Sequence, residues 1–353
     1  MKIGILSMHR VNNYGSFWQA FALKTFLERS NNSVEFIDII PGAIETRTIY
    51  KKTFSFSKIK KIPYYLFNSK KGKMFANFQK KVLKCSDTPN YSAEYDAIII
   101  GSDEVFNFVQ ASPWGFSTQL YGDIPNTHVS SYAACFGYTT FKDIEEKGVK
   151  KEITSALNNL KHISVRDQNS AAIIEKLINR KPEIHLDPVL VGDLPVEASS
   201  DVDTDNFILI YSYDFRFSDK AIIERIKNLA KEQHCAIYSV GFYQDWCDKN
   251  ILPDPYELLN VYFKKAKYII TDTFHGTIFS VRLHKKFVTV IRDSNKNKLG
   301  DLLKRLQLEK RAITSSDDLK TVLFADIDYV RFEKLREIER KRTEEYLRLC
   351  LKQ

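Results

Sequence analysis

Short apolar runs alternate with amphipathic stretches along the first half of the chain. The runs have strand length, and in several of them apolar and polar residues alternate, which is typical of β-structure. The strands expected from them lie at 2–7, 33–40, 95–100, 128–135 and 162–166, and residues 183–191 are expected to run from a strand into a Pro-containing turn. The intervening stretches carry apolar residues at helical spacing, and helices are expected at 16–30, 143–160 and 168–178. This alternation predicts a parallel sheet with helices on both faces.

A second series of the same kind follows residues 192–206, which are acidic and nearly devoid of large apolar side chains. Strands are expected at 206–213, 235–241, 268–271 and 287–291, and helices at 219–233, 255–266 and 328–350. We therefore expect an N-terminal domain at 1–195, a C-terminal domain at 206–327 and an amphipathic C-terminal helix at 328–353. Two doubly wound α/β domains of this kind are expected to bind ligands in the cleft between them, at the strand carboxyl ends.

Positive charge is concentrated in one segment. The chain has 353 residues, ordinary globular composition and a net charge of +9, which excludes a disordered or collagenous protein. Residues 51–84 hold eleven lysines and no acidic residue, so the net charge of the rest of the chain is −2. The same segment holds seven aromatic residues: Phe54, Phe56, Tyr64, Tyr65, Phe67, Phe75 and Phe78. Lysines beside aromatic rings suit an anionic surface such as phospholipid headgroups or a polyprenyl diphosphate; the alternative is a solvated helical face with an apolar underside. No nucleic-acid partner is expected, because the segment has no arginine and no recognisable nucleic-acid module accompanies it.

The chain shows no membrane span, signal peptide or metal motif. No apolar run approaches the roughly 18–20 residues that a spanning helix needs, and the apolar run at the N-terminus is too short for a signal-peptide core. We expect a cytoplasmic protein, with peripheral contact at the inner face of the membrane through residues 51–84. The five cysteines are scattered without a CxxC pair, so we expect neither a disulfide framework nor a bound metal.

The sharpest chemical signal is the sequence TDTFHGTIFSVRL at 271–283. Here a strand runs into a polar turn and then a helix, expected to start near Gly276 or Thr277, whose free amides attract an anion. His275 suits a general acid near neutral pH, with Thr273 and Thr277 as neighbouring binding groups. The alternative is that His275 satisfies a backbone carbonyl.

Three further loops follow expected strands. Arg166 closes HISVR and suits a bidentate grip on phosphate or carboxylate; the alternatives are a salt bridge with Asp167 or a helix cap. In GSDEVFN at 101–107, Ser102 and Asp103 are candidate binding and catalytic residues or else helix caps. Asn13 lies in the similar loop NNYGS at 12–16, where it or Ser16 suits a cap. Neither GxGxxG nor a P-loop occurs, and the Asp-Pro pair at 187–188 is interpreted as a turn.

The ordered set NNYGS, GSDEVFN, ISVRD, HLDPVLV and ITDTFHGTIFS resembles the polysaccharide pyruvyl transferase family over roughly residues 1–310. The resemblance implies a glycosyltransferase-B-like fold of two Rossmann-like domains, with the acceptor on the N-terminal side and the donor on the C-terminal side. It implies transfer of pyruvate from phosphoenolpyruvate to two hydroxyls of a sugar as a cyclic ketal, in surface or exopolysaccharide biosynthesis. The acceptor would be a sugar or a lipid-linked oligosaccharide, and no cofactor is implied beyond phosphoenolpyruvate as donor substrate. His275 and Arg166 match residues that the family associates with phosphoenolpyruvate.

Two departures from the family pattern bear on the donor. Many members carry arginine where this chain has Thr273, and many read GSDQVWN where this chain has Glu104 and Phe106. The positive charge that this arginine would supply could come instead from Arg282, Lys285, Lys286 or a lysine of 51–84. Within the implied chemistry, His275 would protonate the donor methylene carbon, Arg166 and the helix N-terminus would bind its anionic groups, and Asp103 would act as base. The alternatives are a glycosyltransferase that uses a nucleotide sugar and a non-catalytic sugar-binding member.

Overall fold

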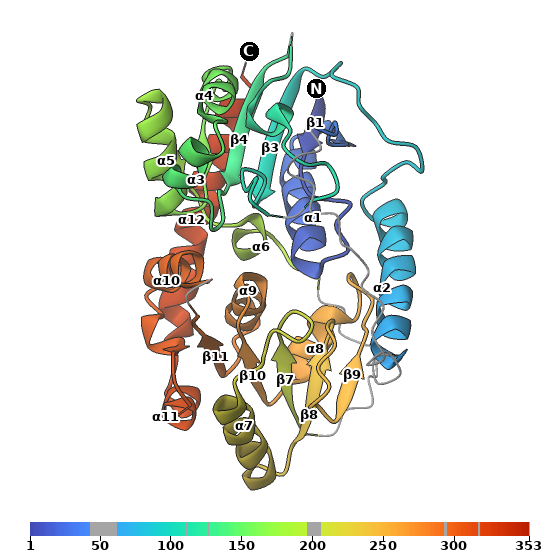
Figure 1. Cartoon of the computed structure of the whole chain (residues 1–353), viewed down its shortest axis with the longest axis vertical. Helices are drawn as coiled ribbons and strands as arrows, with labels where there is room; N and C mark the ends of the chain where they lie inside the picture. The colour runs from blue at the N-terminus through green and yellow to red at the C-terminus, as the bar shows by residue number, and fades with distance from the viewer. Residues whose placement is uncertain are drawn as a thin grey trace. The chain divides into compact units, whose positions relative to one another are not determined.

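The computed structural model describes residues 1–42, 62–110, 112–125, 127–195, 206–292, 295–316 and 318–352. The chain forms two compact units, each with its own parallel sheet (Figure 1). Unit 1 comprises residues 1–55, 76–193 and 336–353, and unit 2 comprises residues 56–75 and 194–335. The strong strand and helix signals in the sequence thus correspond to a two-unit α/β protein.

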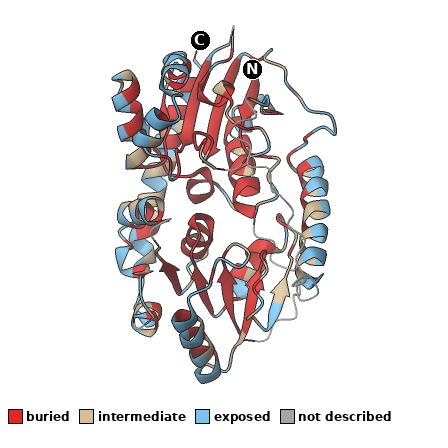
Figure 2. Ribbon diagram, viewed as in Figure 1, coloured by how far each residue is buried: buried red, intermediate tan, exposed pale blue. Residues whose placement is uncertain are grey.

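The sheet of unit 1 has six parallel strands in the order β2-β1-β3-β4-β5-β6. The strands are β1 (Lys2–Leu6), β2 (Ser33–Ile37), β3 (Ala97–Asp103), β4 (Val129–Ala134), β5 (Ser164–Val165) and β6 (Glu183–Ile184). The helices are α1 (Tyr14–Glu28), η3 (Thr118–Tyr121), α3 (Phe141–Glu146), α4 (Lys150–Asn158), α5 (Gln168–Ile178) and α6 (Pro188–Val191). Apolar side chains of α4 and α5 share one core cluster with those of β1, β3, β4 and β5, and consecutive residues along β1 and β3 are buried (Figure 2).

The sheet of unit 2 also has six parallel strands, in the order β12-β11-β10-β7-β8-β9. They are β7 (Phe207–Tyr211), β8 (Ala236–Val240), β9 (Lys249–Ile251), β10 (Tyr268–Thr271), β11 (Phe287–Val290) and β12 (Ala312–Ile313). The helices are α7 (Lys220–Glu232), α8 (Leu259–Lys265), α9 (Phe274–Arg282), α10 (Lys296–Arg305), η4 (Glu309–Arg311) and α11 (Leu319–Phe324). The apolar stripe of α7 packs on β7, β8 and β10, which explains why Ile222, Ile226 and Leu229 are spaced as they are.

Three sequence predictions change in detail. The single helix expected at 143–160 is two helices, because Gly148 adopts a left-handed conformation (φ +68°) between α3 and α4. Strand β3 continues to Asp103 instead of stopping at Gly101, since Asp103 still pairs with Ala134 of β4. Helix α9 starts at Phe274, two residues earlier than expected, because the Thr273 side chain caps it.

Helix α2 (Ile62–Lys81) carries the described part of the lysine-rich segment. Tyr64 and Phe67 contact the ring of Tyr243, and Tyr64 also contacts Phe215. These aromatic contacts lie within unit 2, to which residues 56–75 belong, whereas the sequence analysis grouped all of 51–84 with the N-terminal domain. Phe54, Phe56 and the lysines at 51, 52, 58, 60 and 61 lie outside the described residues.

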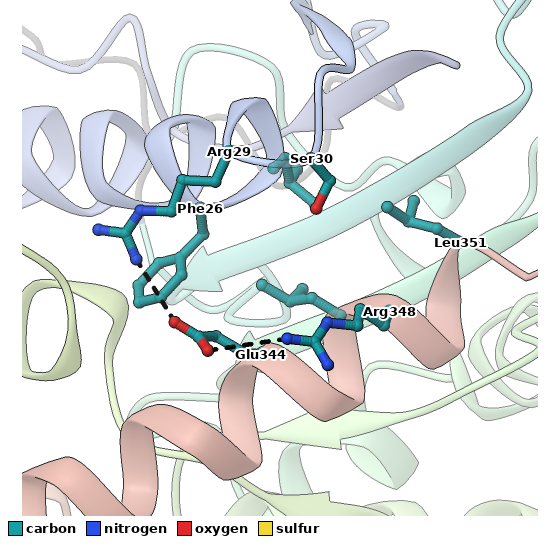
Figure 3. Close-up of a pocket in the computed structure, with 8 residues that line it drawn as sticks. Phe26, Arg29, Ser30, Glu344, Arg348 and Leu351 are labelled. Carbon is teal, nitrogen blue, oxygen red and sulfur yellow. Dashed lines mark ion pairs between the residues drawn. The ribbon is translucent and has the colours of Figure 1, made fainter.

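Helix α12 (Tyr329–Cys350) is divided between the units, and residues from Arg336 onward belong to unit 1. There the Tyr346 hydroxyl donates to the backbone oxygen of Ser131. Figure 3 shows Glu344 of α12 between Arg29 at the end of α1 and Arg348 one turn further along α12. Its C-terminal half is thus part of a folded unit and not an appended helix. None of the described helices is both long and apolar enough to cross a bilayer.

Candidate active-site residues

In both sheets the strand order reverses at one position. In unit 1 the reversal lies between β1 and β3, and in unit 2 it lies between β7 and β10. The loops that leave such strands diverge to opposite sides, which opens space for a ligand at the carboxyl edge of the sheet. The predicted residues Asn13, Ser102 and Asp103 follow or end the first pair of strands, and Thr273 to Thr277 follow β10.

In unit 1, Arg166 is bound to a buried carboxylate. Its Nη1 donates to Asp187 Oδ2 at 2.9 Å and lies 3.6 Å from Asp103 Oδ1. Asp167, given above only as an alternative partner of Arg166, accepts from the backbone nitrogen of Ser170 and caps α5. The guanidinium is therefore held inside unit 1 by ion pairing; its role in substrate binding stays a prediction.

Asp103 and Ser102 lie in the same cluster as Arg166. The Ser16 hydroxyl donates to Asp103 Oδ2 at 2.8 Å, and the Ser102 hydroxyl lies 3.4 Å from Asp187 Oδ2. The structure thus brings together Ser102, Asp103 and Arg166 and adds two residues, Ser16 and Asp187. From the sequence alone, Ser16 is expected only as a helix cap and Asp187 only as part of a turn.

Asn13 has a local structural role. Its side-chain oxygen accepts from the backbone nitrogen of Gly15 at 2.7 Å, which caps α1 as one of the sequence alternatives stated. Contact with substrate stays a prediction for this residue.

In unit 2, hydroxyl groups fix the turn that carries His275. Thr273 accepts from the backbone nitrogen of Gly276 at 2.9 Å, and its hydroxyl lies 3.0 Å from that of Thr271. The Thr277 hydroxyl donates to the Thr273 carbonyl and lies 3.0 Å from Thr289 of β11. A Cβ at Gly276 would lie 2.1 Å from Thr271 Oγ1. The backbone of Gly276 is therefore packed closely against the protein's own threonine side chains, next to His275 in the first turn of α9.

An arginine–aspartate pair adjoins this turn. Asp272, between β10 and Thr273, accepts a hydrogen bond from the side chain of Arg292, which follows β11. Burial raises the pKa of the Asp272 carboxyl, and the charges of Arg292 and Arg216 only partly oppose this. Asp272, Arg292 and Arg216 line one cavity of about 210 Å³ at the carboxyl ends of β7, β10 and β11.

Arg292 is a candidate that the sequence analysis missed. It stands just after the strand expected at 287–291, so the strand-end rule that selected Arg166 would also have selected it. Lys285, one of the charges considered as a substitute for arginine at 273, donates to the backbone oxygen of Lys264. Arg292, by contrast, is bonded to Asp272, the residue that precedes Thr273.

Two observations concern metals and thiols. Within the described ranges, no cluster of three or more His, Cys, Asp or Glu side chains is arranged to hold a metal ion. Cys85, Cys135, Cys235, Cys247 and Cys350 are all free thiols.

Comparison with known proteins gives both a family and a fold. A model of the family described as polysaccharide pyruvyl transferase matches residues 13–294. The solved structure of the spinosyn rhamnosyltransferase SpnG has a TM-score of 0.50 and 11% identity, and covers 99% of both chains. A co-structure of S. aureus MnaA with UDP has a TM-score of 0.52 and 11% identity, and covers 99% of this chain and 97% of that one. No curated protein matches the sequence. At this identity the structural likenesses show the fold alone, and they confirm the predicted α/β class of glycosyltransferase-B type.

Proposed function

The chain belongs to the polysaccharide pyruvyl transferase family, a family of transferases, and from that membership we propose that it transfers pyruvate from phosphoenolpyruvate to two hydroxyls of a sugar. The product is a cyclic ketal, and the acceptor is a sugar or a lipid-linked oligosaccharide of surface or exopolysaccharide biosynthesis. The observation that carries the proposal is the turn after β10, which holds His275 next to the Asp272–Arg292 pair at the strand reversal of unit 2.

The proposed transfer adds one proton to the donor, forms two carbon–oxygen bonds to the sugar and breaks the carbon–oxygen bond to phosphate. A proton from His275 adds to the methylene carbon of the donor, which becomes the methyl group of the ketal, and positive charge develops on the neighbouring carbon. Two hydroxyl oxygens of the sugar bond to that carbon, and its bond to the phosphate oxygen breaks. The sugar loses two protons, of which one balances the proton gained by carbon and the other leaves with phosphate or solvent. Asp103 is the proposed base for a hydroxyl.

The anionic groups of the donor need positive partners. Arg292 and Arg216 line the cavity beside the His275 turn, and Arg216 is exposed to solvent. Because Thr273 carries no charge and caps α9, we assign the grip on the donor phosphate to these two arginines. Arg166 stays the proposed partner for the second anionic group.

Direct titration separates this function from its alternatives. Phosphoenolpyruvate and a panel of UDP-sugars are titrated separately by calorimetry, and phosphate release is followed with an acceptor present. We expect binding of phosphoenolpyruvate, weakened about 10- to 100-fold by Arg292→Gln, because a hydrogen bond to a charged group is lost. Arg331→Gln, which changes an exposed arginine on α12, should leave binding unchanged. Binding of a UDP-sugar without phosphoenolpyruvate would indicate a glycosyltransferase, and binding of sugar alone would indicate a non-catalytic member.

A further inference from the structure

Unit 1 holds a second cavity that the residues above do not use. It has a volume of about 380 Å³, within the usual range for small-molecule pockets, and opens at the carboxyl ends of β1 and β2. The lining includes residues that follow these strands, among them His9, Arg10 and Asp38, which are called the polar side below. It also includes Pro89, Tyr91, Pro113 and Trp114, which are called the aromatic side.

The polar side is a fixed and charge-balanced group. Arg10 donates to both carboxylate oxygens of Asp38, and the backbone nitrogen of Asn90 donates to Oδ2 at 2.7 Å. His9 Nε2 lies 3.3 Å from Asp38 Oδ1, and the ring of His9 stacks on Phe36. Burial alone would raise the pKa of Asp38, but the hydrogen bonds from Arg10 and His9 hold it well below its usual range. Asp38 is thus an anion at neutral pH whose charge is already matched by Arg10.

This charge balance selects against anionic ligands. This lining has one arginine, already bonded to its one aspartate, whereas the cavity of unit 2 adds Arg216 to its arginine–aspartate pair, so an anion gains less attraction here. Asp38 already accepts from Arg10 and Asn90 and lies beside His9, so a neutral hydroxyl would be bound by accepting from Arg10, whose guanidinium has five N–H donors. The polar side therefore favours a neutral ligand with several hydroxyl groups.

The aromatic side favours the same ligand. Tyr91 is 48% exposed, and Trp114 is only partly buried, so both rings keep surface that a ligand can cover. A sugar ring presents apolar C–H groups on one face and hydroxyls along its edge. Its C–H face can pack on an aromatic ring while its edge reaches Arg10 and Asp38.

We propose that this cavity binds one pyranose ring of the acceptor, with its C–H face against Trp114 and Tyr91 and its hydroxyls toward Arg10 and Asp38. The proposal rests on the proposed transfer to a sugar for the identity of the ligand. Binding of the sugar is measurable without transfer, which keeps the two hypotheses separable.

The test uses the full chain without donor. Methyl glycosides of glucose, galactose, mannose and their N-acetylamino forms are titrated while tryptophan fluorescence is recorded, and saturation-transfer NMR identifies the sugar protons that contact the protein. We expect at least one glycoside to bind and Trp114→Ala to weaken it about tenfold, because an aromatic contact is lost. Trp114→Phe keeps a ring and should retain most of the affinity. Tyr65→Ala removes a 53% exposed aromatic residue outside the cavity and should change nothing.

Each outcome bears on one hypothesis. Glycoside binding that depends on Trp114, in a protein that does not bind phosphoenolpyruvate, supports the sugar pocket and removes the proposed transfer. Glycoside binding that is equal in the wild type, Trp114→Ala and Trp114→Phe overturns the pocket and leaves the transfer intact. The absence of binding for every glycoside, or fluorescence changes caused by UDP and not by a glycoside, also overturns it.

Discussion

The guanidinium of Arg166 donates to the carboxylate of Asp187 at 2.9 Å, and both side chains are buried. The two residues lie 21 positions apart in the chain and meet because β5 pairs with β6, which places the residues after both strands at one edge of the sheet. Arg166 therefore contributes to the fold of unit 1 whatever it contributes to binding.

Removal of Arg166 should destabilise the protein strongly. Arg166→Ala leaves Asp187 and Asp103 as buried carboxylates without their cation, a change that typically costs about 3–5 kcal/mol. Urea denaturation of the full chain measures this loss of unfolding free energy. Lys142→Ala, which breaks an exposed pair with Glu146, should cost less than about 0.5 kcal/mol. If Arg166→Ala is as stable as the wild type, the structural role predicted here is wrong, and only the proposed role of Arg166 in donor binding is left.

The sequence predicted the units better than the partners of their charged side chains. Strand and helix patterns are local, and they locate the longer strands of both sheets and helices such as α1, α5, α7 and α12 within a few residues. The short strands β9 and β12 and the helices α10 and α11 are not predicted. The sequence alone offers only the neighbouring Asp167 as a salt-bridge partner of Arg166, because the pairing of β5 with β6, which brings Asp187 to Arg166, is not visible in a local pattern. Asp187 was read as a turn residue for the same reason.

Some candidates were missed although a signal existed. Arg292 follows a clear strand, and Asp38 lies within the strand expected at 33–40, which in the structure stops at Ile37. Placed inside a strand, Asp38 had no reason to be considered at the carboxyl edge. His9 gave no signal beyond its position in a polar loop, since its contact with Asp38 depends on the pairing of β1 with β2.

Gly276 should tolerate no side chain. A Cβ there would lie 2.1 Å from Thr271 Oγ1 and 2.6 Å from Thr273 Oγ1, so Gly276→Ala must displace the turn that carries His275. We expect a loss of about 1–3 kcal/mol in unfolding free energy together with weaker donor binding. In the matched control Gly300→Ala, on α10, the added Cβ meets no atom within 4 Å. The control should stabilise the protein by about 0.5–1 kcal/mol, since alanine is the better helix former.

If Gly276→Ala and Gly300→Ala have the same stability by thermal unfolding, the turn after β10 is free to move. The threonine hydroxyl network would then not be what positions His275.

Lys71 should make stability depend on alkaline pH. Its Nζ donates to the backbone oxygen of Gly241 at 2.8 Å, and burial lowers its pKa from 10.5 to about 8, with attraction from Asp214 opposing the shift. Between these two pH values the unfolded chain holds a proton that the folded protein has released. Stability contributed by this group therefore rises with pH across the window, on the order of 3 kcal/mol in total.

The comparison of Lys71→Met with the wild type isolates this effect, because other groups titrate equally in both proteins. As pH rises from 8 to 10.5, the unfolding free energy of the wild type should increase relative to that of Lys71→Met. Lys70→Met, at an exposed neighbouring position, should leave the pH profile unchanged. A constant difference between wild type and Lys71→Met across this range would show that Lys71 remains charged in the folded protein.

The proposed contact with an anionic membrane now rests on the lysines more than on the aromatic residues. Tyr64 and Phe67 contact other rings in unit 2 and Phe75 is fully buried, so these three are engaged within the protein. Lys71 is buried as well. The remaining described lysines of the segment are exposed: Lys70, Lys73, Lys80, Lys81 and Lys84. Each is expected to contribute about 1 kcal/mol near an anionic surface.

Flotation with liposomes of anionic lipid tests this contact. A variant with these five lysines changed to Gln should bind much less than the wild type at low salt. High salt should release the wild type too, because screening over roughly 8 Å at physiological ionic strength already limits the field to nearby charges.

The control changes five exposed lysines of unit 1 to Gln: Lys142, Lys147, Lys150, Lys151 and Lys161. It lowers the net charge equally, so equal loss in both variants would indicate an effect of overall charge and not of this segment. If the wild type does not float at low salt, the segment covers protein surface and the acceptor is fully soluble.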